Sequence, residues 1–190
     1  MSAKRKYLTV SEVNSLLDAA CDNAYAERDC CMIYMSFVHG FRVSELRYLR
    51  LSDLSLGDRC LYIHRLKNGF STTHPLLSEE IVLIQRWLAV RETMCRENSD
   101  GFFVSRTGGV LSRQRIYQII SALGKKAGIS ISAHPHMLRH ACGYALADRG
   151  VDTRLIQDYL GHRNIRHTVR YTASNPHRFS GIWNSEKNFD

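Results

Sequence analysis

Apolar residues recur at helical spacing over much of the chain. After Thr9 and Glu12, which have the spacing of a capping box, apolar side chains follow at i, i+3, i+4, i+7 and i+8 and predict an amphipathic first helix. A nearly continuous apolar run over 28–38 stops at Gly40, which predicts a buried helix with a glycine at its carboxyl end. A short helix is expected to resume at Ser44.

The pattern is that of strands between residues 59 and 76. Residues 60–63 and 70–73 favour strands, and the Asn68-Gly69 pair between them is a strong signal for a hairpin turn. Lys67 is therefore predicted at the tip of an antiparallel hairpin.

Helical spacing returns in the second half of the chain. The sequence predicts helices at 78–94 and 112–123, a short strand at 102–105, and three short helices beginning near Pro135, Asp152 and Ile165. No internal repeat or linker-like segment interrupts this pattern. We expect one mainly α domain with a small antiparallel β-hairpin or sheet over residues 1–174, followed by a loosely attached tail at 175–190.

The charge of the chain is unevenly distributed. Its 190 residues have a formal net charge of +8, of which residues 1–110 contribute +1 and residues 111–190 contribute +7. Such a concentration predicts a surface that binds phosphate, on nucleic acid or on anionic lipid. Apolar residues make up 44% of the chain, which excludes a disordered protein.

Two further features concern the cellular compartment. No apolar run is long enough to cross a bilayer and the first residues lack a secretory signal, so we expect a cytoplasmic protein. The chain has six cysteines, none in a CxxC pair, and we expect them to be buried free thiols. These residues are Cys21, Cys30, Cys31, Cys60, Cys95 and Cys142.

Polar residues are densest over 134–140. On a helix that begins near Pro135, His136 and Arg139 share one face, and an imidazole beside a guanidinium suits the binding of phosphate oxygens. A zinc site is the alternative, built from His134, His136, His140, His162 and His167. Because His134 and His136 do not face together on a helix, and no Cys or carboxylate completes a familiar set, no metal site is predicted.

The joint pattern resembles the catalytic domain of the tyrosine recombinases, the phage integrase family. The matching pieces follow the family's order, and they are Gly40-Phe-Arg42-Val-Ser-Glu45-Leu, Lys67 in a hairpin, His136-x-x-Arg139-His140, Leu160-Gly161-His162, and Tyr171. The stretches 65–76 and 152–175 are similar to the Fim-type recombinases, a short subgroup that inverts a promoter-bearing DNA segment to phase-vary fimbrial genes. The resemblance covers about residues 8–172 and implies a catalytic domain that lacks the family's separate N-terminal core-binding domain.

The resemblance implies a site-specific recombinase that cleaves and rejoins DNA through a 3′-phosphotyrosyl intermediate, with no metal, cofactor or ATP. Tyr171 would be the nucleophile. A free tyrosine has a pKa of about 10, so its hydroxyl needs a proton acceptor, and the motif gives that role to His136. Lys67 would protonate the departing 5′ oxygen as a general acid.

The remaining site residues would bind or orient the phosphate. The resemblance implies that Arg42 and Arg139 bind the nonbridging oxygens, where a planar guanidinium offers two parallel donors. It gives His162 a hydrogen bond to the phosphate, and Glu45 and His140 supporting places beside these groups.

The expected partners are double-stranded DNA with inverted repeats, other protomers in a tetrameric synapse, and host DNA-bending proteins, with no membrane and with nucleoid association on DNA. Flanking DNA contacts are expected from Arg113, Arg115, Lys125, Lys126, Arg163, Arg166 and Arg170. The tail carries Phe179, Ile182 and Trp183, too apolar to stay exposed. It either docks on a neighbouring protomer or folds back on its own domain.

Three other protein classes compete with this hypothesis. A DNA-binding regulator that has lost catalysis is disfavoured because the full set of matching residues is present. A type IB topoisomerase uses similar chemistry without site choice, and the Fim-type stretches disfavour it. A lipid-binding protein is disfavoured because no strongly amphipathic basic helix with an aromatic face is present.

Overall fold

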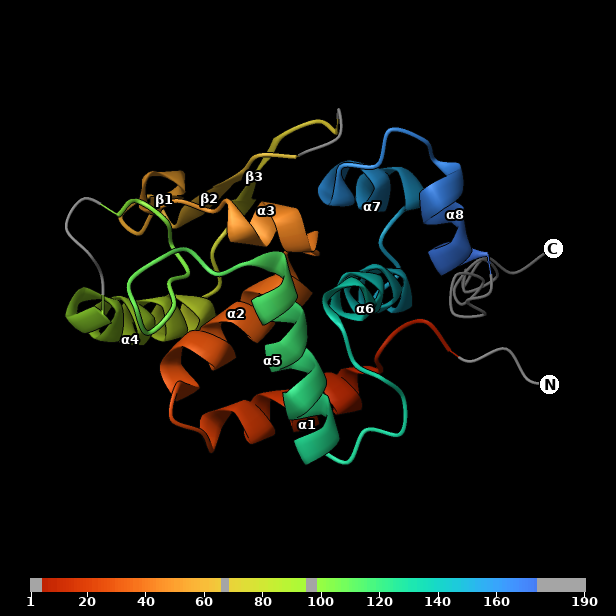
Figure 1. Ribbon diagram of the computed structural model, residues 1–190. Coiled ribbons are helices and arrows are strands. Elements are labelled where there is room, and N and C mark those ends of the chain that lie inside the picture. The colour runs from red at the N-terminus through yellow and green to blue at the C-terminus, as the bar shows by residue number, and fades with distance from the viewer. Residues whose placement is uncertain (1–4, 66–68, 95–98, 174–190) are drawn as a thin grey trace, which may run out of the picture.

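The computed structural model describes residues 5–65, 69–94 and 99–173. It is mainly helical, with one small sheet at an edge of the molecule, as the sequence predicts (Figure 1). In chain order the elements are α1 (Val10–Cys21), α2 (Ala26–Val38), α3 (Val43–Arg47), a 3-10 turn (Leu51–Asp53), β1 (Leu54–Ser55), β2 (Cys60–Ile63), β3 (Thr72–Pro75), α4 (Ser78–Met94), α5 (Arg113–Lys126), α6 (Pro135–Asp148), α7 (Thr153–Leu160) and α8 (Arg166–Thr172).

The predicted starts of α1, α6 and α7 are confirmed, and each has a local cause. Thr9 Oγ1 accepts a hydrogen bond from the Glu12 amide at 3.2 Å, and the Glu12 carboxylate accepts one from the Thr9 amide at 2.8 Å. Pro135 occupies the first turn of α6, where its missing N–H costs nothing. Asp152 caps α7 through its carboxylate. The short helices of the last third therefore begin where the sequence places them.

The sheet is antiparallel in the order β1-β2-β3, and it differs from the predicted hairpin in two respects. The short strand β1 is not predicted, and β3 spans Thr72–Pro75 rather than 70–73. The prediction included Phe70 because its side chain is apolar, but this side chain is 73% exposed and does not pack in the sheet. Lys67 and Asn68, the predicted hairpin tip, lie outside the described residues.

The strand predicted at 102–105 is wrong. The segment makes only isolated bridges, one of them between Val104 and Val110. Its carbonyl groups are bound instead by side chains of α4, because Trp87 Nε1 donates to the Phe102 carbonyl at 3.1 Å and Arg91 binds the Gly101 carbonyl. Residues 102–105 therefore form a buried loop, because side chains of α4 bind its backbone and no strand in the described part of the chain pairs with it.

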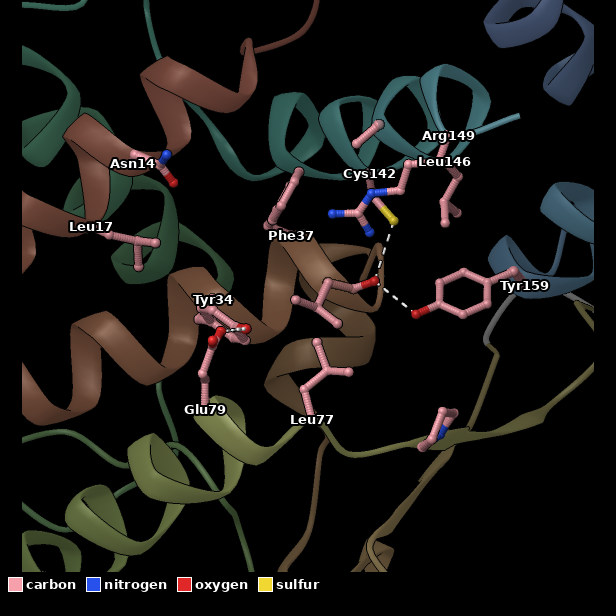
Figure 2. Close-up of a pocket in the computed structure, with 13 residues that line it drawn as sticks. Asn14, Leu17, Tyr34, Phe37, Leu77, Glu79, Cys142, Leu146, Arg149 and Tyr159 are labelled. Carbon is pink, nitrogen blue, oxygen red and sulfur yellow. Dashed lines mark hydrogen bonds between the residues drawn. The ribbon is translucent and has the colours of Figure 1, made fainter. Parts of the chain in front are cut away.

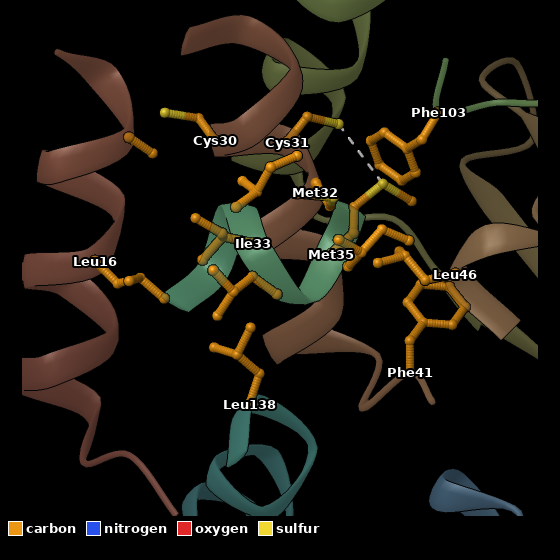
Figure 3. Packing of buried hydrophobic residues seen from close by; sticks show 14 of the residues in the cluster. Leu16, Cys30, Cys31, Met32, Ile33, Met35, Phe41, Leu46, Phe103 and Leu138 are labelled. Atoms are coloured by element: carbon orange, nitrogen blue, oxygen red, sulfur yellow. Dashed lines mark hydrogen bonds between the residues drawn. The ribbon is translucent and has the colours of Figure 1, made fainter. Parts of the chain in front are cut away.

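The main hydrophobic core surrounds α2 (Figure 3). Met32, Ile33 and Met35 on this helix are fully buried. Leu16 of α1 packs on one side of it and Leu138 of α6 on another. A nearly continuous apolar sequence is what a helix enclosed on several sides requires, which is why this prediction succeeded.

A second, smaller cluster lies between α6, α7 and α8. It consists of buried residues from these three helices, and they are Cys142, Ala147, Ile156, Leu160 and Tyr171. The predicted nucleophile therefore belongs to the packing of the last three helices.

Cys30, Cys31 and Cys142 are buried free thiols, as predicted. Cys21 is exposed, contrary to the prediction, because it lies at the end of α1. Cys95 lies outside the described residues. Among the described helices, none combines the length and apolar character that crossing a membrane requires.

Candidate active site

A cleft of about 190 Å³ gathers the predicted chemistry. It is lined by Arg42, His136, Arg139, His140, His162, His167, Arg170 and Tyr171. These side chains come from the residue before α3, the first turns of α6, the second residue after α7, and α8. All predicted catalytic residues that the structure describes meet here, whereas Lys67 lies outside the described residues.

The two predicted phosphate-binding arginines differ in burial. Arg139 is 2% exposed, and its guanidinium donates to the Gly40 carbonyl and to the Leu160 carbonyl, the latter at 2.7 Å. Burial first, then Arg42 and other nearby cations, lower the pKa of Arg139 to about 9, so it stays charged at neutral pH. Arg42 is more accessible, with 22% of its side chain exposed.

Glu45 connects the arginines beneath the cleft. Its Oε1 pairs with Arg42 Nη1 at 2.5 Å, and its Oε2 lies 2.9 Å from Arg65 Nη1 and 3.8 Å from Arg139 Nη1. Burial alone would raise the pKa of this carboxyl, but Arg65, Arg139 and Arg42 outweigh it and hold the pKa below its usual value. Glu45 is therefore an ionised anchor for three guanidinium groups.

Tyr171 is almost fully buried, with 1% of its surface exposed. Its hydroxyl lies 2.9 Å from His140 Nδ1. Burial raises the pKa of Tyr171 to about 12, against the opposing effect of Arg139 and Arg170. The hydroxyl is therefore protonated at neutral pH, and it needs a base before it can act as a nucleophile.

The histidines of the cleft are suited to accept a proton. Burial, together with neighbouring cations, lowers the pKa of His140 to about 4 and that of His162 to about 3, and it also lowers the pKa of His136. Their imidazoles are thus neutral at neutral pH. The rings of His136 and His140 lie edge to face at 5.1 Å, one helical turn apart.

His140 forms a hydrogen bond with the Tyr171 hydroxyl, whereas the resemblance implied only a supporting place for it. The signal for it was present, since His136 and His140 are four residues apart on α6 and share a face. His162 is fixed by Thr168, whose hydroxyl lies 2.9 Å from His162 Nδ1. When the Thr168 hydroxyl donates to Nδ1, the neutral His162 ring carries its hydrogen on Nε2.

Arg65 was missed by the motif analysis. It is 5% exposed and binds Glu45 and two backbone carbonyls. A weak signal existed: Leu61 and Ile63 alternate onto the buried face of the strand, and the same alternation places Arg65 on that face.

The predicted DNA contacts are all exposed, and they are Arg113, Arg115, Lys125, Lys126, Arg163, Arg166 and Arg170. Arg170 lines the cleft itself, and Arg113 lines an adjoining groove together with His136. Lys126, near the other end of α5, pairs with Asp22 at 2.8 Å. Their contacts with DNA stay predictions.

A separate cavity of about 300 Å³ lies between α2, α6 and the start of α4 (Figure 2). Tyr34, Phe37 and Leu146 contribute to its wall. None of the predicted catalytic residues that the structure describes lines it.

The fold is that of a tyrosine recombinase catalytic domain. The model of the phage integrase family matches residues 6–178, and the chain belongs to this family. It is 58% identical to the type 1 fimbriae regulatory protein FimB of Escherichia coli K12, over 95% of this chain and 90% of the relative. It is 54% identical to the type 1 fimbriae regulatory protein FimE of the same strain, over 95% of this chain and 92% of the relative.

Solved structures show the same fold. The XerA recombinase superposes with a TM-score of 0.80 at 30% identity, covering 90% of this chain and 61% of the XerA chain. The XerH site-specific recombinase in a post-cleavage complex with its difH substrate superposes with a TM-score of 0.78 at 24% identity, covering 94% of this chain and 53% of that one. This chain thus spans about three-fifths of the XerA chain and about half of the XerH chain.

Proposed function

We propose that this protein is a site-specific DNA recombinase that inverts a promoter-bearing segment and so phase-varies fimbrial genes. The observation that supports it most directly is the cleft in which Arg42, Arg139 and Tyr171 converge from separate elements. The similarity to FimB and FimE over most of the chain supports the fimbrial role.

The reaction is a transesterification. The Tyr171 oxygen attacks phosphorus and forms a bond to the 3′ phosphate, while the bond from phosphorus to the 5′ oxygen breaks. His136 takes the tyrosine proton and Lys67 gives a proton to the 5′ oxygen. Rejoining reverses both transfers, so the energy of the phosphodiester is kept and no ATP is consumed.

The charge that develops on the phosphoryl oxygens is met by Arg42, Arg139 and His162. Because Arg139 is held by two backbone carbonyls, its position is fixed before DNA binds, and preorganised donors need no rearrangement during the reaction. These groups perform the charge stabilisation without a metal ion in our proposal. The described residues contain no group of three His, Cys, Asp or Glu side chains placed to hold one.

His140 and His136 divide the work on the nucleophile. The Tyr171 hydroxyl is hydrogen-bonded to His140 Nδ1. His136, which lines the cleft beside it, serves as the base when the scissile phosphate occupies the cleft. Both imidazoles are neutral at neutral pH, as a proton acceptor must be.

The partners follow from this reaction. Inversion requires double-stranded DNA with two inverted repeats, four protomers in the synapse, and host proteins that bend the DNA between the repeats. Residues 1–174 form the catalytic domain in this proposal. The tail at 175–190 docks on a neighbouring protomer. The protein acts in the cytoplasm and joins the nucleoid through its DNA sites.

The test uses supercoiled plasmids that carry a promoter segment between candidate inverted repeats from a fimbrial gene cluster. The protein should form a covalent adduct with this DNA that survives denaturation, and it should invert the segment, whereas Tyr171→Phe should do neither. Adduct formation by the Tyr171→Phe variant would contradict the assignment. Relaxation of plasmids without repeats, with no inversion, would indicate a topoisomerase, and binding without cleavage would indicate a regulator.

A further inference from the structure

Arg65 and Arg139 bind the same two segments of the chain. At the end of α2, Arg65 Nη2 donates to the His39 carbonyl at 3.2 Å, and Arg139 donates to the next carbonyl, that of Gly40. At the end of α7, Arg65 Nη2 donates to the Tyr159 carbonyl at 2.6 Å and Arg139 Nη2 to the next carbonyl at 2.7 Å. The two guanidinium groups therefore form parallel bridges between α2 and α7.

The surrounding contacts leave little freedom for either bridge. The hydroxyl of Tyr159 donates to the Val38 carbonyl at 2.9 Å, so α7 is tied to the carboxyl end of α2 by a third contact (Figure 2). The Arg65 side chain passes over Gly161, where an added Cβ would lie 2.8 Å from Arg65 Cγ. Arg65 thus packs on the residue that precedes His162.

Arg65 also determines what Glu45 can bind. Glu45 Oε2 is 2.9 Å from Arg65 Nη1 but 3.8 Å from Arg139 Nη1. Without Arg65, Glu45 Oε2 would keep the Arg42 amide at 2.8 Å, and the guanidinium left beside it would be that of Arg139. A closer Glu45–Arg139 pair would draw the Arg139 guanidinium away from the phosphate and neutralise its charge.

We propose that Arg65 is a positioning residue of the recombinase site, which holds Glu45 and the end of α7 so that Arg139 and His162 face the scissile phosphate. The inference rests on the proposed strand-transfer activity. Arg65 itself touches no reacting atom. Its effect belongs to the cleavage step, because a displacement of about 1 Å in a positioning group costs about 10²-fold in rate.

The experiment measures single-turnover cleavage with the full chain, on a DNA repeat at which the unmodified protein forms the covalent adduct. We expect Arg65→Met to slow adduct formation by about 10²-fold while DNA affinity changes by less than about threefold. The matched control is Arg86→Met, on the exposed face of α4, which should cleave at the unmodified rate. Equal rates for Arg65→Met and the unmodified protein would overturn the inference.

Two further measurements separate positioning from other roles. A substrate with sulfur in place of the 5′ leaving oxygen needs no general acid, so it should restore cleavage by Lys67→Ala but not by Arg65→Met. In a double-mutant cycle, Arg65→Met and Glu45→Gln should be strongly non-additive, because both act on Arg139. Restoration of Arg65→Met by the sulfur substrate, or additive defects, would show that Arg65 does not act through Glu45.

Arg65→Lys provides the test if Arg65→Met does not fold. A lysine keeps the charge but cannot bind Glu45 and two carbonyls in a planar fork, so cleavage should still fall by about tenfold. An unmodified rate for a folded Arg65→Lys would overturn the inference. If the unmodified protein forms no adduct on any repeat, the proposed function fails, and that result is distinct from failure of the role of Arg65.

Discussion

Tyr171 is held from two sides. Its hydroxyl contacts His140, and its ring lies against Gly143 of α6. A Cβ at Gly143 would be 2.6 Å from Tyr171 Cε2, well inside van der Waals contact. The absence of a side chain at Gly143 therefore allows the ring of the proposed nucleophile to occupy this position.

This contact gives a prediction for Gly143→Ala. Alanine favours a helix by about 1 kcal/mol over glycine, so α6 should stay folded, while the added methyl group displaces the tyrosine ring. We expect adduct formation to fall by about 10²-fold, as for other displacements of a reacting group. Adduct yield on denaturing gels and the melting temperature measure the two effects.

The control is Gly57→Ala, at a glycine where an added Cβ would meet nothing within 4 Å. It should cleave DNA as the unmodified protein does. A Gly143→Ala variant that also cleaves normally would show that the ring position in this cleft is not the reactive one.

At this scale the sequence predicted which residues meet but not how they are paired. The resemblance to the family motif implied one site for Arg139, His162 and Tyr171, and the structure brings them together. It did not reveal that His140 contacts the tyrosine or that Arg65 binds Glu45. Those pairings depend on contacts between elements far apart in the chain, which the spacing of residues within one motif does not encode.

At the scale of elements, a buried polar cluster joins the sheet to α2 and α4. His39 Nε2 lies 2.6 Å from Glu80 Oε1, and His39 Nδ1 lies 3.0 Å from His74 Nδ1 on β3. The ring of His74 also packs on that of Tyr159, with centroids 4.0 Å apart. This cluster connects the strand next to β2 with the helix that precedes His162.

The cluster predicts a pH-dependent stability. Burial, followed by the charges of His39 and Arg65, lowers the pKa of His74 to about 3 from an ordinary 6.5. The fold therefore favours the neutral ring, and this stabilisation is complete above pH 6.5 and is lost as the pH falls toward 3. Between pH 6.5 and 3, each unit by which the pH falls lowers the free energy of unfolding by up to about 1.4 kcal/mol through His74.

Urea unfolding between pH 7 and pH 4 measures this slope. The variant His74→Asn keeps a hydrogen-bonding side chain without a titrating group, so its free energy of unfolding should fall less steeply with decreasing pH than that of the unmodified protein. Parallel curves for the two proteins would show that His74 does not titrate between folded and unfolded states.

Elements with local signals were predicted best. Caps at Thr9, Pro135 and Asp152 fixed helix starts because each involves neighbouring residues. The predictions of the start of β3 and of a strand at 102–105 were wrong, because a segment becomes a strand only where another strand pairs with it. There Arg91 and other α4 side chains bind the carbonyls that a neighbouring strand would otherwise bind.

At the scale of the whole molecule, part of the excess positive charge of residues 111–190 lies at the cleft. Exposed arginines follow α8 and the loop before it, and Arg170 extends this surface into the cleft. Within it lie Arg139 and Arg42, partly balanced by the single carboxylate of Glu45. The arrangement favours a polyanion that can place one phosphate in the cleft and neighbouring phosphates on its rim.

The last prediction concerns DNA affinity and salt. Each phosphate contact releases counterions, so the logarithm of the binding constant falls with the logarithm of salt concentration by about 0.9 per contact. Arg170→Ala and Arg113→Ala should each weaken binding to repeat and non-repeat DNA alike and reduce this slope by about one contact. Arg86→Ala, on the exposed face of α4, is the control and should leave the DNA affinity and the salt slope unchanged. Fluorescence anisotropy over a salt series measures the slopes, and an unaltered slope for both test variants would place the DNA on another face of the protein.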